Sequence, residues 1–201
     1  LLDSFPVHLI KKIKQKYFEI FVSFEKKRFV ELLQPLENKN IIQYLEENKI
    51  SLPDNFRMEI NLNIKDWLSN ISNVLNKGNL IIIDYGYLQK ELLKPLHKKG
   101  TLICYYKHQV SENPFVRIGM QDITSHLNFS FIIKEAEKNG FIKPEFMKQS
   151  EFVISSGLGE ILNALKDEDE KEYLKASLAS KNLFLPSRMG DIFKVLTLET
   201  K

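Results

Sequence analysis

The sequence is poor in cysteine, in clustered glycine, in net charge and in long apolar runs. Its single cysteine, Cys104, excludes an intramolecular disulfide, and its place inside an apolar run predicts an inert thiol in the core. No apolar run approaches the roughly 20 residues that a membrane-spanning helix needs, and Leu1-Leu2-Asp3 lacks the features of a signal peptide. We therefore predict no membrane association and a cytosolic or matrix-like compartment.

The formal net charge is only +3 over 201 residues, and its lysines and arginines are dispersed. Proteins that bind nucleic acid usually gather such residues on one face, so we expect no nucleic-acid partner. The length suits one well-filled domain, or a core with a small appendage. The eight glycines are scattered, and none forms a G-x-G-x-x-G turn after a strand, so the usual nucleotide-binding turn is missing.

Two polar clusters follow apolar segments in the middle of the chain. Four consecutive apolar residues, Leu80 to Ile83, predict a strand covered on both faces, as in the parallel sheet of an α/β protein. Asp84-Tyr85-Gly86 follows directly, and Gln121-Asp122-Ile123-Thr124 lies further on. Ligands of α/β proteins bind beyond the carboxyl ends of strands, so we expect the site there.

Other segments show helical or alternating periods. We predict a hairpin from Tyr17 to Leu33, and a final strand from Asp191 to Leu198. The acidic run from Asp167 to Glu170 favours a helix start over a metal cluster, so we expect no metal. Helices are expected over 41–45 after Asn38 or Asn40, over 64–76, after Gly86, from Asn128 to Gly140, around 158–165 and after the acidic run.

The ordered series of motifs resembles the MidA-type class I methyltransferases, which include the mitochondrial arginine methyltransferase of respiratory complex I assembly. The residues that carry the resemblance are Leu1-Leu2-Asp3, Pro6-Val7, Ile83-Asp84-Tyr85-Gly86, Gly100-Thr101-Leu102, Tyr106, His108, Gly119, Gln121-Asp122-Ile123-Thr124, His126, Asn128-Phe129, Gln149, Phe152, Gly157, Met189-Gly190 and Phe193. One departure is Asn128, where the family usually has Asp. The greater departure is the absence of the glycine-rich segment that holds S-adenosylmethionine in the family.

The resemblance therefore implies the C-terminal part of a Rossmann-like class I methyltransferase fold, of class α/β. It assigns strands five, six and seven to Leu80–Tyr85, about Ile142–Lys148 and Asp191–Leu198, the last antiparallel. Residues 1–78 would be an inserted substrate-side subdomain of a β-hairpin and helices, and residues 79–201 the sheet with its flanking helices. The strand over residues 79–85 would then need a partner, either the missing S-adenosylmethionine-binding half or another copy in a homodimer.

The resemblance also implies the chemistry of the site. A guanidinium acceptor stays protonated in water, so carboxylates are needed to orient it, and Asp84, Asp122 and Asp3 are the candidate catalytic residues. Tyr85, Gln121, Thr124 and His108 are the candidate substrate-binding residues, while the cofactor-binding residues are unknown. Structural alternatives are a helix cap for Asp84, Asp122 and Thr124, and a hydrogen-bonding role for His108 and His126.

The leading hypothesis is an S-adenosylmethionine-dependent protein methyltransferase, with arginine as the acceptor, of which this chain alone would be inactive. It would act in the bacterial cytoplasm or in the mitochondrial matrix. Two alternatives stay open: a non-catalytic assembly module that docks a partner protein, and a methyltransferase for a small molecule or nucleic acid.

Overall fold

The structure, a computed structural model, describes residues 1–107, 109–185 and 188–200. The fold is mixed α/β, and the contacts divide the chain into two compact units. Unit 1 comprises residues 1–74 and 86–135, and unit 2 comprises residues 75–85 and 136–201. No helix in the described part of the chain is both long and apolar enough to cross a lipid bilayer.

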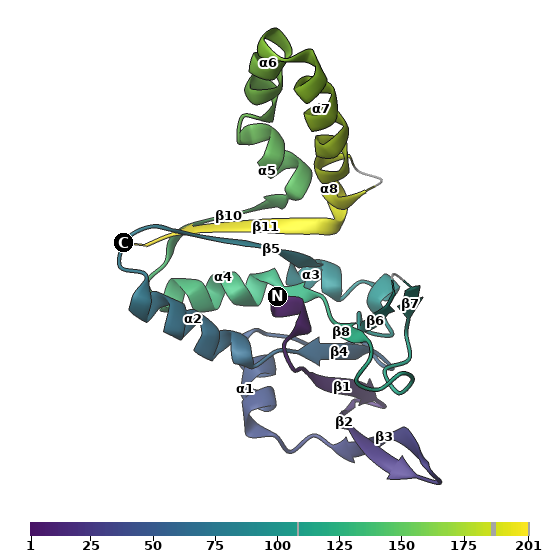
Figure 1. Ribbon diagram of the computed structural model, residues 1–201. Helices are drawn as coiled ribbons and strands as arrows, with labels where there is room; N and C mark the ends of the chain where they lie inside the picture. Colours follow the sequence, from purple (N-terminus) through teal and green to yellow (C-terminus); the bar gives the residue numbers. More distant parts are fainter. Residues whose placement is uncertain (108, 186–187, 201) are drawn as a thin grey trace. The chain divides into compact units, whose positions relative to one another are not determined.

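Unit 1 contains an antiparallel sheet in the order β3-β2-β1-β4. Alternation of apolar and polar residues makes these strands, and one face carries Ile10, Met58 and Ile60 into the core. The hairpin of β2 and β3 confirms the one predicted from Tyr17 to Leu33 (Figure 1). The strands are β1 (His8–Ile13), β2 (Lys16–Glu25), β3 (Arg28–Pro35) and β4 (Arg57–Ile60).

A smaller sheet of unit 1 has the order β7-β6-β8. Its central strand buries Cys104 completely, which confirms a core position for the only cysteine. Asp122 and Thr124 belong to β8 of this sheet, so they do not cap the helix that follows Asn128. The strands are β6 (Ile103–Tyr106), β7 (Gln109–Ser111) and β8 (Asp122–Thr124).

Helices cover the core of unit 1. Asn38 accepts a hydrogen bond from the amide of Asn40 at the start of the first helix, and Asn128 accepts one from the amide of Phe131 in the fourth. The two caps therefore agree with the predicted helix starts. The elements are η1 (Leu2–Ser4), α1 (Lys39–Glu47), α2 (Asn63–Val74), α3 (Gln89–Leu92), η2 (Pro95–His97), β9 (Leu127–Asn128) and α4 (Phe129–Lys138), the last of which continues into unit 2.

Unit 2 is built on three antiparallel strands, β10, β11 and β5. The predicted strands near Leu80, Ile142 and Leu198 are all present, and the last is antiparallel to its neighbours as expected. Helices α5, α6, α7 and α8 stand together on one side of these strands (Figure 1). The elements are β5 (Asn79–Tyr87), β10 (Ile142–Lys148), α5 (Gln149–Ser155), α6 (Leu158–Glu168), α7 (Glu170–Phe184), α8 (Met189–Ile192) and β11 (Phe193–Glu199).

Strand β5 corrects one prediction. Ile82 is 5% exposed, but Ile81 and Ile83 are 49% and 47% exposed, so the strand is not covered on both faces. The apolar run suggested a fully buried parallel strand, whereas β11 lies antiparallel beside it and Ile81 and Ile83 point to the face opposite Ile82. The division of the chain also differs from the predicted boundary near residue 78, because residues 86–135 pack with residues 1–74.

The end of β5 enters unit 1. Gly86 and Tyr87 pair in parallel with Leu127 and Asn128 of β9. A Cβ atom on Gly86 would lie 2.4 Å from the carbonyl oxygen of Leu127, so only glycine permits this close approach of the two backbones. The close packing of β5 against β9 therefore requires glycine at the third position of the Asp84-Tyr85-Gly86 motif.

Candidate functional site

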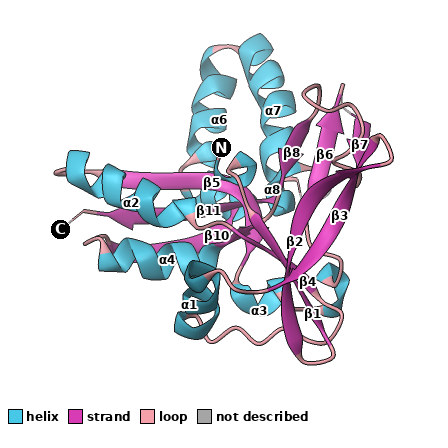
Figure 2. Ribbon diagram, turned by 90° about the horizontal axis from the view of Figure 1, so that it is seen from below, coloured by secondary structure: helices cyan, strands magenta, loops and turns pink. Residues whose placement is uncertain are grey.

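A large groove lies within unit 1, between its two sheets. The groove has a volume of about 2030 Å³. Figure 2 shows β2 and β3 beside the sheet of β6, β7 and β8. We call this cavity the unit 1 groove; its walls include Asp3, His8, Lys11, Glu19, Phe21, Phe29, Glu31, Arg57, His97, Thr101, Phe115, Ile123, Thr124 and His126.

Two contacts fix the hairpin over the groove. The Arg57 guanidinium on β4 donates from both Nη atoms to the Glu31 carboxylate on β3, at 3.1 and 2.7 Å. The ring of Phe29 stacks on that of Phe115, which lies in the loop between β7 and β8, with 6.5 Å between centroids. A bidentate pair and an aromatic stack are both directional, so they hold the hairpin tip in one orientation.

The walls of the groove combine apolar surface with charges of both signs. Phe21, Phe29 and Phe115 supply rings, and Lys11, Lys98 and Lys99 lie along the same cavity. Its carboxylates include the buried Glu19, whose Oε1 lies 2.7 Å from Nδ1 of His8. The groove therefore offers contacts to a ligand that is part apolar and part charged.

Glu59 on β4 holds the segment that links η2 to β6. Its carboxylate accepts hydrogen bonds from the Thr101 amide and from Thr101 Oγ1, each at about 3.0 Å. Desolvation raises the pKa of Glu59, and the bonds from Thr101 partly offset that rise. Oγ1 of Thr101 also accepts from the His126 amide at 2.9 Å, so Glu59 indirectly positions a second wall of the groove.

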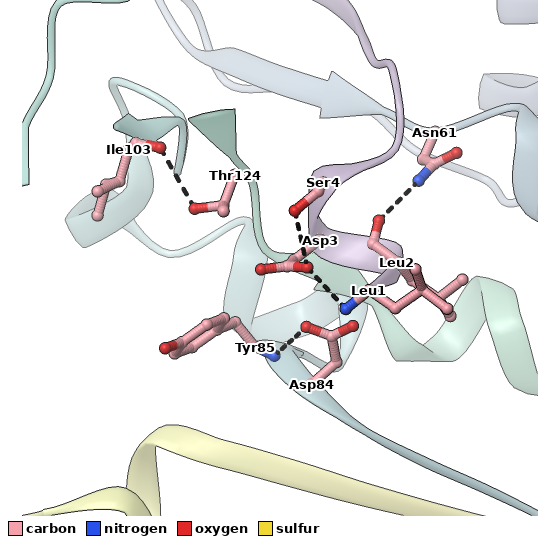
Figure 3. Close-up of polar contacts among 9 residues, drawn as sticks. All are labelled: Leu1, Leu2, Asp3, Ser4, Asn61, Asp84, Tyr85, Ile103 and Thr124. Atoms are coloured by element: carbon pink, nitrogen blue, oxygen red, sulfur yellow. Dashed lines mark hydrogen bonds and ion pairs between the residues drawn. The ribbon is translucent and has the colours of Figure 1, made fainter. Parts of the chain in front are cut away.

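Among the predicted residues, Asp3 and Thr124 line the unit 1 groove. Asp3 is buried, and its carboxylate accepts from Ser4 Oγ (Figure 3). The carbonyl of Asp3 accepts from the Ser125 amide. Thr124 Oγ1 donates to the carbonyl of Ile103 at 3.3 Å. These bonds tie η1 and β6 to the segment around β8.

Asp122 and Gln121 lie in the same unit but do not line the groove. Asp122 is exposed on β8, and Gln121 donates from Nε2 to the carbonyls of Asn113 and Pro114, each at 3.2 Å. Gln121 Oε1 is buried with no hydrogen-bond partner among the described residues. The amide of Gln121 thus closes the loop that carries Phe115.

Asp84 and Tyr85 belong to unit 2. Asp84 is buried and its Oδ1 accepts from the Tyr85 amide at 2.8 Å (Figure 3). Across the strands it stands opposite Lys194, and the Tyr85 ring packs against Phe193 with 4.3 Å between centroids. His108, the remaining candidate, lies outside the described residues.

The residues that escaped the sequence reasoning include Arg57 and His97, which line the groove, and Glu59, which lines a small cavity together with both. Arg57 and Glu59 lie on β4, which has four residues. The alternation in Arg57-Met58-Glu59-Ile60 was the available signal, and a strand this short gives a weak one. His97 follows Pro95 in a segment that is too short to show a period, so the sequence does not predict which side chains face the core.

Solved structures share the fold of this chain. An uncharacterised protein from Burkholderia thailandensis is 27% identical, with a TM-score of 0.88; the match covers 99% of this chain and 53% of that one. A second structure from Burkholderia thailandensis, described as a "likely methyl transferase" bound to S-adenosyl-homocysteine, is 28% identical with a TM-score of 0.88. The match covers 99% of this chain and 51% of that one. The chain thus spans about half the length of these structures.

No curated protein matches the chain significantly. A family model described as "Putative S-adenosyl-L-methionine-dependent methyltransferase" matches residues 1–147. That range includes the whole of unit 1 with its groove, and the Asp84-Tyr85-Gly86 motif. The chain belongs to this methyltransferase family.

Proposed function

We propose that the protein is an S-adenosylmethionine-dependent methyltransferase that modifies a protein side chain, and that the unit 1 groove receives the acceptor. The family match over residues 1–147 is the observation that supports the reaction class. The structural relative bound to S-adenosyl-homocysteine, the product of methyl donation, supports S-adenosylmethionine as the cofactor.

The size of the groove supports a polypeptide acceptor. Sites for small molecules usually enclose about 300–1,000 Å³. The unit 1 groove has about 2030 Å³, with rings, carboxylates and ammonium groups distributed along it. An extended chain with mixed side chains fits this surface better than a small metabolite does.

The MidA-type resemblance suggests arginine as the acceptor residue. A guanidinium binds best to carboxylates, which match its planar fork. Asp3 lines the groove and is the candidate to orient the acceptor there, with Thr124 beside it as a substrate-binding residue. Asp84 and Asp122 are proposed as further catalytic carboxylates, and Tyr85, Gln121 and His108 as further acceptor contacts.

We also propose that the chain is the C-terminal part of a Rossmann-like enzyme. Along residues 79–85, β5 pairs with β11 on one side, and the exposed Ile81 and Ile83 lie on this strand. The S-adenosylmethionine-binding half of the enzyme would pair with its other edge, or a second copy would do so in a homodimer. The chain alone would then transfer no methyl group.

Calorimetry with S-adenosylmethionine on the full-length protein tests the reaction class. Saturable binding, together with transfer of a labelled methyl group to protein in a cell extract, is the expected result. Mapping the labelled peptide then identifies the acceptor residue. A well-folded protein that binds no S-adenosylmethionine would instead favour an assembly module, and label in nucleic acid or small molecules would change the acceptor class.

A further inference from the structure

The side-chain rings of Tyr87, His97 and His126 lie close together in unit 1, and the proposed function assigns them no role. The Tyr87 ring lies 4.9 Å from that of His97 and 5.3 Å from that of His126, between centroids. The two histidine rings lie 6.3 Å apart in an edge arrangement. Tyr87 ends β5, His97 ends η2 and His126 directly precedes β9, so three separate segments of the chain meet here.

The two histidines of this ring cluster lie in the wall of the unit 1 groove. His97 and His126 both line the groove, and both are half-buried rather than sealed in the core. Imidazoles that reach a ligand groove from two different segments are accessible to a bound acceptor. A histidine that served only to fill the core would be covered.

The backbone around the cluster is rigidly held. The His126 amide donates to Thr101 Oγ1, which itself donates to the Glu59 carboxylate. Glu59, Thr101, His97 and His126 also surround a second cavity of about 10 Å³, which is close to the volume that one water molecule needs. His97 and His126 therefore border the small polar cavity as well as the unit 1 groove.

The surroundings of His97 favour a neutral ring. Desolvation lowers the pKa of His97, and nearby Lys94 lowers it further, while Glu91 acts in the opposite direction. Arg57, Glu59 and His126 face it across the small cavity, and Lys98 and Lys99 follow it along the chain. A neutral imidazole near pH 7 can accept a proton.

We propose that His97 is the proton acceptor of the methyl transfer, and that His126 and Tyr87 hold its ring against the groove. This inference rests on the proposed function. An acceptor nitrogen forms a bond to the methyl carbon as the carbon–sulfur bond breaks and the sulfur keeps the electron pair. The nitrogen then loses one proton, which passes to the neutral imidazole of His97 and later to water.

The experiment uses the full-length protein, methyl-labelled S-adenosylmethionine and cell-extract protein as the acceptor. His97→Asn preserves much of the side chain's size but removes the base. We expect its transfer rate to fall by about 100-fold or more at neutral pH, within the usual contribution of a general base. Its affinity for S-adenosylmethionine should stay unchanged, and added imidazole should partly restore the rate of His97→Gly.

The pH dependence separates a proton acceptor from a structural residue. The wild-type rate should fall on the acid side below the ordinary histidine pKa of 6.5, because the pKa of His97 is lowered. That acid limb should disappear in His97→Asn and His97→Gln. The matched control is His8→Asn, a groove histidine paired with Glu19, in which the acid limb should persist whatever the change in KM.

Two results would overturn this role while leaving the proposed function in place. One is a wild-type rate that stays constant from about pH 5.5 to about pH 8, which needs no variant to fold. The other is intact S-adenosylmethionine binding with an unchanged rate in both His97→Asn and His97→Gln. Loss of S-adenosylmethionine binding by the wild-type protein would instead refute the proposed function itself.

Discussion

At the scale of single residues, buried contacts around the groove decide what each side chain can do. Glu59 is the clearest case, because its carboxylate accepts from both the amide and the hydroxyl of Thr101. Gly100 lies so close that a Cβ atom there would meet Glu59 Oε1 at 2.2 Å. The Glu59 carboxylate therefore packs directly against the backbone at Gly100, and a larger residue at Gly100 would displace it.

Glu59→Ala should lower the free energy of unfolding by about 1–2 kcal/mol, because it leaves the donors of the buried Thr101 without the carboxylate that accepts from them. Urea unfolding of the full-length protein measures the change. Thr101→Val removes the hydroxyl alone, so its effect in the Glu59→Ala background should be smaller than in the wild type. Additive effects would contradict the coupling of the two residues.

The raised pKa of Glu59 gives its contribution to stability a defined pH dependence. Because its folded-state pKa exceeds the unfolded value, this contribution is complete below about pH 4.5 and is lost as the pH rises through the folded-state pKa. Glu59→Gln does not titrate, so its stability should decrease less than that of the wild type over this rise. Unfolding curves at several pH values test this, and parallel pH profiles would contradict it.

Gly86→Ala should destabilise the protein by about 2 kcal/mol or more, because the new methyl group would overlap the Leu127 backbone and the Phe129 ring. Its melting temperature compared with that of Gly140→Ala provides the measurement. Gly140 has a positive φ, but an added Cβ there would meet no described atom within 4 Å, so the control isolates backbone strain from overlap. Equal losses in the two variants would count against the close approach of β5 and β9.

At the scale of elements, the hairpin of β2 and β3 is the part that shapes the groove. Its tip is held by the Arg57–Glu31 pair and by the Phe29–Phe115 stack, which reach it from β4 and from the loop before β8. Neither contact belongs to the β2–β3 ladder itself. The ladder can therefore persist when the tip is released.

Phe115→Ala and Arg57→Gln together should speed amide hydrogen exchange at the hairpin tip, while the exchange of buried Ile10 in β1 stays slow. Mass-resolved exchange on the full-length protein measures both. Lys175→Gln serves as the control, because it breaks an exposed pair with Glu172 on α7 that bears no relation to the hairpin. Unchanged exchange at the tip would show that the two contacts do not restrain it.

The helices and strands also show which elements can be predicted from sequence patterns. The hairpin, α2 and α4 were predictable because each has a sustained period. Strand β5 was predicted from an apolar run without a period, and β10 was assigned only through the family resemblance. β4 and β9 were missed because strands of four and two residues are too short for their alternation to be distinctive. The ring cluster was unpredictable for a stronger reason, since Tyr87, His97 and His126 meet only after three segments pack.

At the scale of the whole molecule, the groove could not be predicted from sequence at all, because it depends on two sheets of unit 1 facing each other. The candidates Asp3 and Thr124 line it, and they were named from family motifs rather than from any period. The error at Ile81 and Ile83 has the same origin. A run of apolar residues does not show which of its side chains the rest of the molecule covers.

Residues 1–201 prepared alone should self-associate, because Ile81 and Ile83 on β5 present an exposed apolar face. Sedimentation of this chain with and without Ile81→Thr and Ile83→Thr measures the effect, and the double substitution should reduce association. In the longer enzyme proposed above, the same substitutions should instead lower stability, because the additional chain would cover these residues. A monodisperse wild-type chain of residues 1–201 would contradict the expectation.

The threading of the backbone through both units affects how the protein reaches its native state. Ile82 on β5 pairs with Leu196 on β11. Because the ribosome adds Leu196 more than a hundred residues later, the β5–β11 ladder cannot form until then. Pairings between such distant positions slow folding, and an uncovered strand invites aggregation meanwhile. Nascent chains should therefore depend on chaperones until the segment that contains Leu196 has been synthesised.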